Sequence, residues 1–335
     1  MSTPRCSRES KRQIRNVGIQ NATMAHGGGK SFATYSEFAD FYELEEFQKS
    51  MDLTQQPTKI TQLESGRPLI RSTQLDLNGS QLAVFEMSHK VKMETHLKPG
   101  ESVLVLKLDR QTHVTWNGMQ FPEWGVALMR GGSTYEIVHK SGCKLIEITL
   151  PDSLLFEFGM VELDADPTQI RLSEREGRLY AHRLLTLVEA PSNEDYDVEQ
   201  LAIRKQTHTI CAGLLDRLEA RAEPVVPERV ARARVTRAER IIEERLRSPL
   251  DLIDLAKAVA VSPRTLQREF RKVLGTTPQA YLLARRLEAA KQQLRKGSLS
   301  TVADVSDLYG FSHPSRFAEQ YKRHFGECPS SLTRS

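Results

Sequence analysis

Between Pro249 and Pro329 the chain contains one pattern written twice. The two copies keep apolar residues, a serine, a proline and a glycine in the same order. Equivalent residues, first copy before second, are Leu252 and Val302, Leu255 and Val305, Ser262 and Ser312, Pro263 and Pro314, Phe270 and Tyr321, and Gly275 and Gly326. They lie fifty residues apart up to the serine and fifty-one apart after it. Such a repeat constrains the fold, because both copies are expected to form the same supersecondary unit.

Each copy predicts a short helix, a tight turn and a longer helix. In the first copy Asp251 can cap the short helix, whose apolar residues recur at helical spacing. Ser262 can cap the longer helix, and Pro263 fits its first turn, where an amide hydrogen is not needed. Gly275 can end that helix in the left-handed conformation. This order of signals is typical of a helix-turn-helix.

The longer helix of each copy carries polar side chains on the face opposite its apolar stripe. In the first copy these are Arg264, Gln267, Arg268 and Arg271, and in the second Ser315, Arg316, Glu319 and Lys322. Arginine and glutamine can make paired hydrogen bonds to guanine and adenine edges in the major groove. A helical repeat with a solvated charged face is the alternative for either helix alone. The occurrence of the pattern in both copies favours nucleic-acid binding.

One long helix is predicted between the copies, from Pro278 to Lys296, because that stretch is rich in Ala, Leu, Arg, Glu and Gln. At 1.5 Å per residue it spans about 27 Å. A spacer of that length can hold two reading helices about one turn of DNA apart, roughly 34 Å, on one face of the duplex.

Residues 235–333 resemble the DNA-binding domain of AraC/XylS transcriptional regulators. The resemblance rests on Leu255-Ala256, Ser262, Leu266, Arg268, Phe270, Gly275, Pro278, Gly310-Phe311-Ser312, the run from Ser315 to Lys322, and His324 to Pro329. Three positions depart from the family pattern. Ala260 replaces the usual turn glycine, Ser306 a usual alanine, and Cys328 a threonine that commonly precedes the proline.

The resemblance implies which side chains meet DNA. Base contacts are expected from Arg264, Gln267 and Arg268 in the first copy and from Ser315, Arg316 and Glu319 in the second. Contacts that bind phosphate or position the helices are expected from Ser262, Thr265, Arg271, Lys272, Ser312, Lys322 and Arg323. Glu319 is unusual beside phosphates, and it can either accept from cytosine N4 or pair with Arg323. We expect the first copy to dominate affinity and the second to contribute register or selectivity.

Charge is distributed unevenly along the 335 residues. Residues 229–335 hold 21 Lys and Arg against 11 Asp and Glu, and residues 1–30 hold 6 against 1. The middle, residues 31–228, holds 20 against 31. A basic C-terminal part joined to an acidic middle indicates a DNA-binding domain, whose cations bind phosphate, attached to a sensor domain.

The four cysteines, Cys6, Cys143, Cys211 and Cys328, are widely scattered and lack metal-ligand spacing. That pattern favours free thiols in a reducing cytoplasm over a disulfide framework. No apolar run approaches the length of about eighteen residues that a membrane span needs. The N-terminus lacks the apolar segment of a signal peptide. We therefore expect a cytoplasmic protein.

The N-terminal residues predict a tail followed by a helix. Residues 1–35 are basic and polar, which favours a flexible tail. The sequence Gly29-Lys30-Ser31 does not make a phosphate loop, because Met24 stands where glycine is needed and no apolar strand precedes it. From Ser36 to Met51, aromatic and leucine residues recur at the spacing of an amphipathic helix.

From Thr58 to about Leu150, short alternating runs broken by turn residues predict seven or more strands. Asn78-Gly79 and Asn117-Gly118 are typical of hairpin turns. This pattern predicts a sandwich or barrel of jelly-roll type, which can enclose a small-molecule cavity. The family resemblance implies the same, because N-terminal domains of that family are often cupin-like ligand sensors.

No catalytic, cofactor or metal site is predicted. Cupin metal sites tend to use a close His-x-His pair with a later carboxylate, and His89, Glu94 and His96 do not reproduce that arrangement. His113 and His139 are expected on the surface or in the core. No nucleophile and base stand in a recognisable order, so we predict that the chain is not an enzyme.

Two helices are predicted after about Ser173, the second from about Asp195 to Ala222. The apolar stripe of the second helix contains Ile203, Ile210, Leu214 and Leu218. These side chains either pack on the β-domain or form the seam of a homodimer, which the family resemblance supports. The stripe is too short and impure to establish a coiled coil.

The sequence therefore predicts a two-domain α+β chain. Residues 36–222 form a β-rich, jelly-roll or cupin-like sensor with helices, residues 223–234 a linker, and residues 235–335 an all-α domain of two helix-turn-helix motifs joined by a long helix. The expected function is a transcriptional regulator that binds double-stranded DNA and activates transcription under the control of a small-molecule effector. Its expected partners are RNA polymerase and a second copy of the chain, in a homodimer. The alternatives are a regulator controlled by a protein partner and a cupin-like enzyme with a DNA-binding tail.

Overall fold

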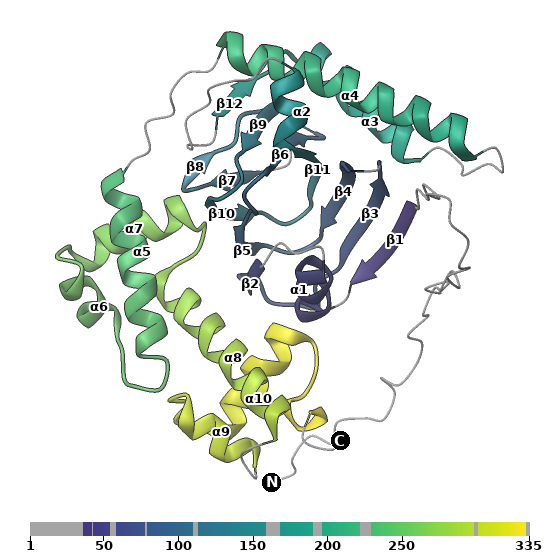
Figure 1. The fold of residues 1–335 in the computed structure, drawn as a ribbon. Coiled ribbons are helices and arrows are strands. Elements are labelled where there is room, and N and C mark those ends of the chain that lie inside the picture. The colour runs from purple at the N-terminus through teal and green to yellow at the C-terminus, as the bar shows by residue number, and fades with distance from the viewer. Residues whose placement is uncertain are drawn as a thin grey trace. The chain divides into compact units, whose positions relative to one another are not determined.

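The computed structural model describes most of the chain from Ser36 onward. The described ranges are 36–41, 43–53, 58–77, 79–109, 113–158, 168–189, 196–221, 229–297 and 301–332. The predicted tail, residues 1–35, and its Gly29-Lys30-Ser31 sequence lie outside them. Figure 1 shows a β-rich domain followed by a helical domain within the described part of the chain, which confirms the predicted two-domain α+β class.

The β-domain contains two antiparallel sheets (Figure 1). The strands of the seven-stranded sheet, in spatial order, are β1 (Ser36–Phe41), β3 (Ile70–Asp76), β4 (Gln81–Met87), β11 (Cys143–Pro151), β6 (Glu101–Lys107), β9 (Gly125–Met129) and β12 (Thr168–Arg171). Those of the five-stranded sheet are β2 (Thr58–Gln62), β5 (Val91–His96), β10 (Thr134–His139), β7 (Val114–Trp116) and β8 (Met119–Gln120).

Both faces of the seven-stranded sheet are buried. Alternate residues along β11, such as Leu145 and Ile146, point to opposite faces and belong to two different apolar clusters. The cluster around Leu145 fills the space between the two sheets and includes Phe85, Trp116 and Tyr135. Burial on both faces explains why these strands read as short apolar runs with only partial alternation.

The other cluster lies under two helices, α3 (Glu174–Val188) and α4 (Tyr196–Arg221). Ser173 caps α3 in a capping box, because its hydroxyl accepts from the Glu176 N–H while the Glu176 carboxylate accepts from the Ser173 N–H. Leu214 and Leu218 of α4 are fully buried against the sheet. A shorter helix, α2 (Asp152–Glu157), follows β11 directly.

The predicted helix from Ser36 to Met51 is wrong in its first half. Residues 36–41 form β1, which pairs antiparallel with β3, and only then does α1 (Leu44–Leu53) begin. The six residues Ser36–Phe41 pair with residues of β3 that lie 29 to 39 positions away along the chain, so pairing outweighs local periodicity. The Asn117-Gly118 turn is confirmed between β7 and β8, with φ of 49° and 77° at its two central residues.

The first helix after the β-domain begins within the stretch that was predicted as a linker. Helix α5 (Arg229–Glu244) includes residues 229–234, which the sequence assigned to the linker. The remaining elements are α6 (Leu252–Ala258), α7 (Pro263–Val273), α8 (Pro278–Lys296), α9 (Val302–Leu308), α10 (Pro314–Phe325) and the short 3-10 helix η1 (Pro329–Ser331). These bounds confirm two helix-turn-helix units, α6–α7 and α9–α10, joined by α8.

The capping signals of the first unit work as predicted. Asp251 accepts from the Asp254 N–H at 2.7 Å, and Ser262 accepts from the Thr265 N–H at 3.1 Å. Gly275 follows α7 with φ of 64°. In the second unit the extra residue shifts the N-cap of α10 from Ser312 to His313, whose side chain makes no capping bond.

Two apolar clusters hold the helical domain together, one under each unit. The first includes Leu266, Phe270 and Tyr281, and the second includes Phe317 and Tyr321. Helix α8 contributes to both clusters, so it connects the two units as a structural spacer. None of the helices in the described ranges has the length and apolar character that crossing a membrane requires.

Candidate nucleic-acid interface

The outward face of α7 carries the side chains expected to contact DNA. Leu266 and Phe270 are fully buried, whereas Arg264 and Arg268 are exposed and Gln267 is half-buried. Arg271 and Lys272 are exposed toward the end of the helix. The one acidic residue of α7, Glu269, is buried and accepts a hydrogen bond from Arg234 of α5 at 2.9 Å. The solvent face of α7 is therefore cationic.

The outward face of α10 is more mixed in charge. Ser315, Arg316 and Glu319 are exposed on the first turns, and Lys322 and Arg323 are exposed on the last. Phe317 and Tyr321 are fully buried. This arrangement gives α10 fewer bidentate donors than α7.

The hydroxyls expected to bind phosphate lie at the N-terminal ends of the two helices. Ser262 and Thr265 are hydrogen-bonded to each other through their hydroxyls at 2.9 Å. Ser312 is exposed and precedes the N-cap of α10 by one residue. The N-terminus of a helix carries partial positive charge and unpaired amide hydrogens, so both ends suit a phosphate oxygen.

Arginines of α8 fix the neighbouring elements. Arg285 donates to both carboxylate oxygens of Glu243 on α5, at 2.5 and 3.0 Å. Arg286 donates to the carbonyls of Leu246 and Ser248, at 3.1 and 2.7 Å. These bonds tie α5 and the loop before α6 to the long spacer helix.

The C-terminal segment matches a family of known domains. Residues 255–335 match the family model described as "Helix-turn-helix domain". The XylDLEGF operon transcriptional activator 1 of Pseudomonas putida is 39% identical over 100 residues, which are 29% of this chain and 30% of that protein. The C-terminal domain belongs to the AraC/XylS type. The probable thc operon regulatory protein of Rhodococcus erythropolis is 32% identical over 160 residues, 45% of this chain and 48% of that protein.

The matched part of this chain covers less than half the length of each of those two relatives. Among solved structures, an AraC-type transcriptional regulator from Chromobacterium violaceum is similar at 33% identity, 31% of this chain, 91% of that chain and a TM-score of 0.30. The AraC-like transcriptional activator CuxR is similar at 14% identity, 76% of this chain, 95% of that chain and a TM-score of 0.45.

The side chains suggested for a dimer seam lie mostly in the core of the chain itself. Ile210, Leu214 and Leu218 of α4 are at most 6% exposed and pack against the seven-stranded sheet. Ile203, on the same helix, is half-buried and packs against the same cluster. These four side chains therefore pack on the β-domain, which is the first of the two alternatives considered from the sequence. The opposite face of α4 carries Leu201, which is 51% exposed.

The three histidines His89, His96 and His139 of the β-domain each contact a different neighbouring side chain. The Nδ1 atom of His89 lies 2.8 Å from the Ser88 hydroxyl, and that of His96 lies 3.0 Å from the Thr134 hydroxyl. His139 is buried beside Cys143, and burial lowers its pKa to about 4. Within the ranges that the structure describes, no three His, Cys, Asp or Glu side chains are grouped to hold a metal ion.

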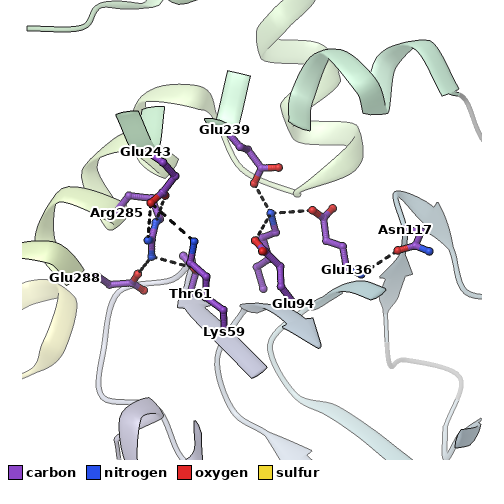
Figure 2. A network of polar contacts seen from close by, with 10 residues as sticks. Lys59, Thr61, Glu94, Asn117, Glu136, Glu239, Glu243, Arg285 and Glu288 are labelled. Atoms are coloured by element: carbon purple, nitrogen blue, oxygen red, sulfur yellow. Dashed lines mark hydrogen bonds and ion pairs between the residues drawn. The ribbon is translucent and has the colours of Figure 1, made fainter. Parts of the chain in front are cut away.

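A network of buried charges was missed by the sequence analysis (Figure 2). Lys92 of β5 is 2% exposed and contacts three carboxylates: Glu94 at 3.2 Å, Glu136 at 2.8 Å, and Glu239 of α5. Burial alone would lower the pKa of Lys92, but the three carboxylates raise it above its ordinary value. One signal was legible: Arg285, Glu288, Lys291 and Arg295 recur at spacings of three and four, which places them on one face of α8.

Proposed function

We propose that this chain is a sequence-specific DNA-binding transcriptional regulator, and that it activates transcription. The observation that carries the proposal is the pair of helices α7 and α10, each buried on its apolar face and each presenting exposed arginine outward. Arg264, Gln267 and Arg268 are assigned to bases in one half-site, and Ser315, Arg316 and Glu319 to bases in the other. The matched relatives, whose names describe operon activators and regulators, support the same function.

The β-domain is proposed as the sensor, with a small molecule as its effector. Glu147 lies on the same face of β11 as Leu145, so its side chain points between the two sheets. Burial raises the pKa of Glu147 to about 7. A carboxyl group at this position offers a polar anchor for an effector that carries an amine or hydroxyl group. The effector changes DNA binding only if it binds two arrangements of the protein with different affinity.

Control by a protein partner is the second candidate. The observation that favours it is the packing between the sheets, where Phe47, Trp116 and Tyr135 are each at most 2% exposed. A screen of small molecules by melting temperature separates the candidates. A ligand that stabilises the wild type, and stabilises Glu147→Gln less, supports the small-molecule effector. If no compound raises the melting temperature and a co-purified protein changes DNA binding, control by a protein partner is supported.

Homodimerisation and contact with RNA polymerase belong to the same proposal. A seam on α4 has to use the face that carries Leu201, because the face carrying Leu214 and Leu218 is occupied by the sheet. The molar mass of the purified chain measured by light scattering tests the dimer directly. A mass that stays at that of one chain up to high concentration contradicts it.

Selection from random duplex DNA tests the function itself. The full-length protein is expected to enrich one motif with two half-sites separated by about one helical turn, roughly 10 base pairs. A double variant, Arg268→Ala with Arg316→Ala, serves as the matched control and is expected to lose the enrichment. Enrichment no greater with the wild type than with this control would contradict the proposal.

A further inference from the structure

The C-terminal end of α7 is held by side chains of the β-domain. Lys90, which precedes β5, donates from Nζ to the Gly275 carbonyl at 2.8 Å. Thr115 of β7 donates to the Val273 carbonyl at 3.3 Å. The last carbonyls of a helix lack partners within the helix and carry partial negative charge. The Thr115 hydroxyl therefore caps the last carbonyl of α7, and Lys90 binds the chain two residues beyond the end of the helix.

The C-terminal end of α10 is held in the same way. The Gln62 side-chain amide at the end of β2 donates to the His324 carbonyl at 2.8 Å, and the Gly66 N–H donates to the same carbonyl at 3.1 Å. Gln62 is 2% exposed, so this contact is shielded from water. Its amide nitrogen also lies 2.7 Å from the carbonyls of Glu64 and Gly66, which fixes the loop that carries the cap.

Ion pairs and hydrogen bonds also join the β-domain to α5 and α8 (Figure 2). Arg285 of α8 donates to the Thr61 hydroxyl at 3.2 Å, and the Gln62 N–H donates to the Glu288 carboxylate at 2.7 Å. Lys92 reaches Glu239 on α5. Farther along α8, Lys291 lies 3.4 Å from Glu45 of α1. The β-domain thus contacts the spacer helix along its charged face and both reading helices at their ends.

We infer that Gln62 and Lys90 are positioning residues for DNA reading, and that the β-domain sets the geometry of the two reading helices by capping their C-terminal ends. The caps leave the reading faces open, because Arg264, Arg268 and Arg316 remain exposed. Each cap fixes the far end of one helix, and the ion pairs along α8 fix their common frame. The half-site spacing that the protein accepts then depends on contacts between the β-domain and the helical domain, and not on the helical domain alone.

This inference rests on the proposed function and adds a route for its regulation. Gln62 lies on β2 and Lys90 immediately before β5, and these two strands are hydrogen-bonded neighbours in the five-stranded sheet. A change that shifts β2 against β5 therefore alters the two caps together. An effector that favours one register of these strands would change the accepted half-site spacing.

The test measures how strongly full-length protein discriminates between half-site spacings. The probes are the duplex selected by the wild type, the same duplex with one base pair inserted between the half-sites, and each half-site alone. Gln62→Leu keeps a similar side-chain volume and removes the side-chain donor to the His324 carbonyl of α10, while the Gly66 N–H remains. Lys90→Met removes the lysine donor at the end of α7, while Thr115 remains. We expect each variant to reduce the discrimination by about tenfold, the effect of losing one well-shielded hydrogen bond. Binding to a single half-site is expected to stay at the wild-type level.

Lys144→Met is the matched control. Lys144 lies in the same domain and forms an exposed pair with Glu86 at 2.7 Å, so this variant is expected to keep the wild-type spacing preference. Melting temperature and near-ultraviolet circular dichroism establish that all variants are folded. Wild-type discrimination in folded Gln62→Leu and Lys90→Met would overturn the positioning role. Absence of sequence-selective binding by the wild type would overturn the proposed function instead, and the two failures are therefore distinguishable.

Discussion

At the scale of single residues, the turn of the first helix-turn-helix contains local strain. Ala260 has φ of 57°, and Gly310 occupies the equivalent turn of the second unit with φ of 75°. The left-handed conformation costs an L-residue about 1–2 kcal/mol, whereas glycine adopts it readily. Ala260, which replaces the glycine usual at this turn, therefore also has an unfavourable backbone conformation.

Exchanging the two residue types should shift stability in opposite directions. Ala260→Gly is expected to raise the free energy of unfolding by about 0.5–1 kcal/mol, and Gly310→Ala to lower it by about 1 kcal/mol. A Cβ atom at Gly310 would meet its nearest neighbour, the Arg286 guanidinium, at 3.6 Å, so the expected loss comes from the backbone. Denaturant unfolding of both variants checks this, and a stabilised Gly310→Ala would contradict it.

A buried histidine should make the β-domain sensitive to acid. The imidazole of His139 is 1% exposed, and burial lowers its pKa from 6.5 to about 4. The unfolded chain binds this proton near pH 6.5 while the folded chain resists until about pH 4. Stability is therefore fully present above pH 6.5 and is lost as the pH falls, by about 3 kcal/mol for this one group.

The measurement is the free energy of unfolding between pH 7 and pH 4 for the wild type and for His139→Gln, which cannot titrate. We expect a shallower dependence on pH in the variant, whatever its stability at pH 7. Parallel curves for the two proteins would assign the acid sensitivity to other groups.

At the scale of elements, local signals determine how much of the fold could be predicted. The helices of both repeat units were predicted because their caps act within four residues, as at Asp251 and Ser262. The first strand, Ser36–Phe41, was not predicted because its hydrogen-bond partners lie on β3. The exposure of the residues proposed to contact bases could be predicted, since it follows from the periodicity of each helix.

Contacts between the β-domain and the helices could not be predicted in the same way. Lys92, Glu136 and Glu239 are far apart in the sequence, and none belongs to a motif. Their burial depends on which faces of β5, β10 and α5 come together. A single strand with alternating Lys92, Glu94 and His96 reads as a solvated face, although Lys92 is 2% exposed.

The buried lysine should be costly to remove by itself. Lys92→Met leaves Glu136 and Glu239 without their shared cation, and we expect a loss of about 3–5 kcal/mol in the free energy of unfolding. The double variant Lys92→Met with Glu239→Gln should recover part of that loss, because fewer charges remain buried. Lys144→Met, which removes an exposed ion pair, should cost at most about 1 kcal/mol.

Thermal and denaturant unfolding of the three variants provide the comparison. Equal losses in Lys92→Met and Lys144→Met would mean that the buried pair contributes no more than a surface pair. A double variant that is less stable than Lys92→Met would contradict a direct interaction between Lys92 and Glu239.

At the scale of the whole molecule, the basic and acidic side chains of the helical domain have distinct positions. The cationic side chains Arg264, Arg268 and Arg271 are exposed on one face of α7. Acidic side chains such as Glu239, which is buried, and Glu243, which is half-buried, instead face lysines and arginines. This separation leaves positive charge available for phosphate while the internal ion pairs hold the reading helices in place.

The central claim is that α7 and α10 read DNA sequence, and the affinity of full-length Arg268→Ala tests it most directly. Affinity is measured at one fixed salt concentration for the selected duplex and for a duplex of random sequence. We predict a loss of about 1–3 kcal/mol on the selected duplex and a smaller loss on the random one, as expected for a base contact. Equal losses on both duplexes would contradict the account, because they would make Arg268 a phosphate contact without a role in sequence recognition.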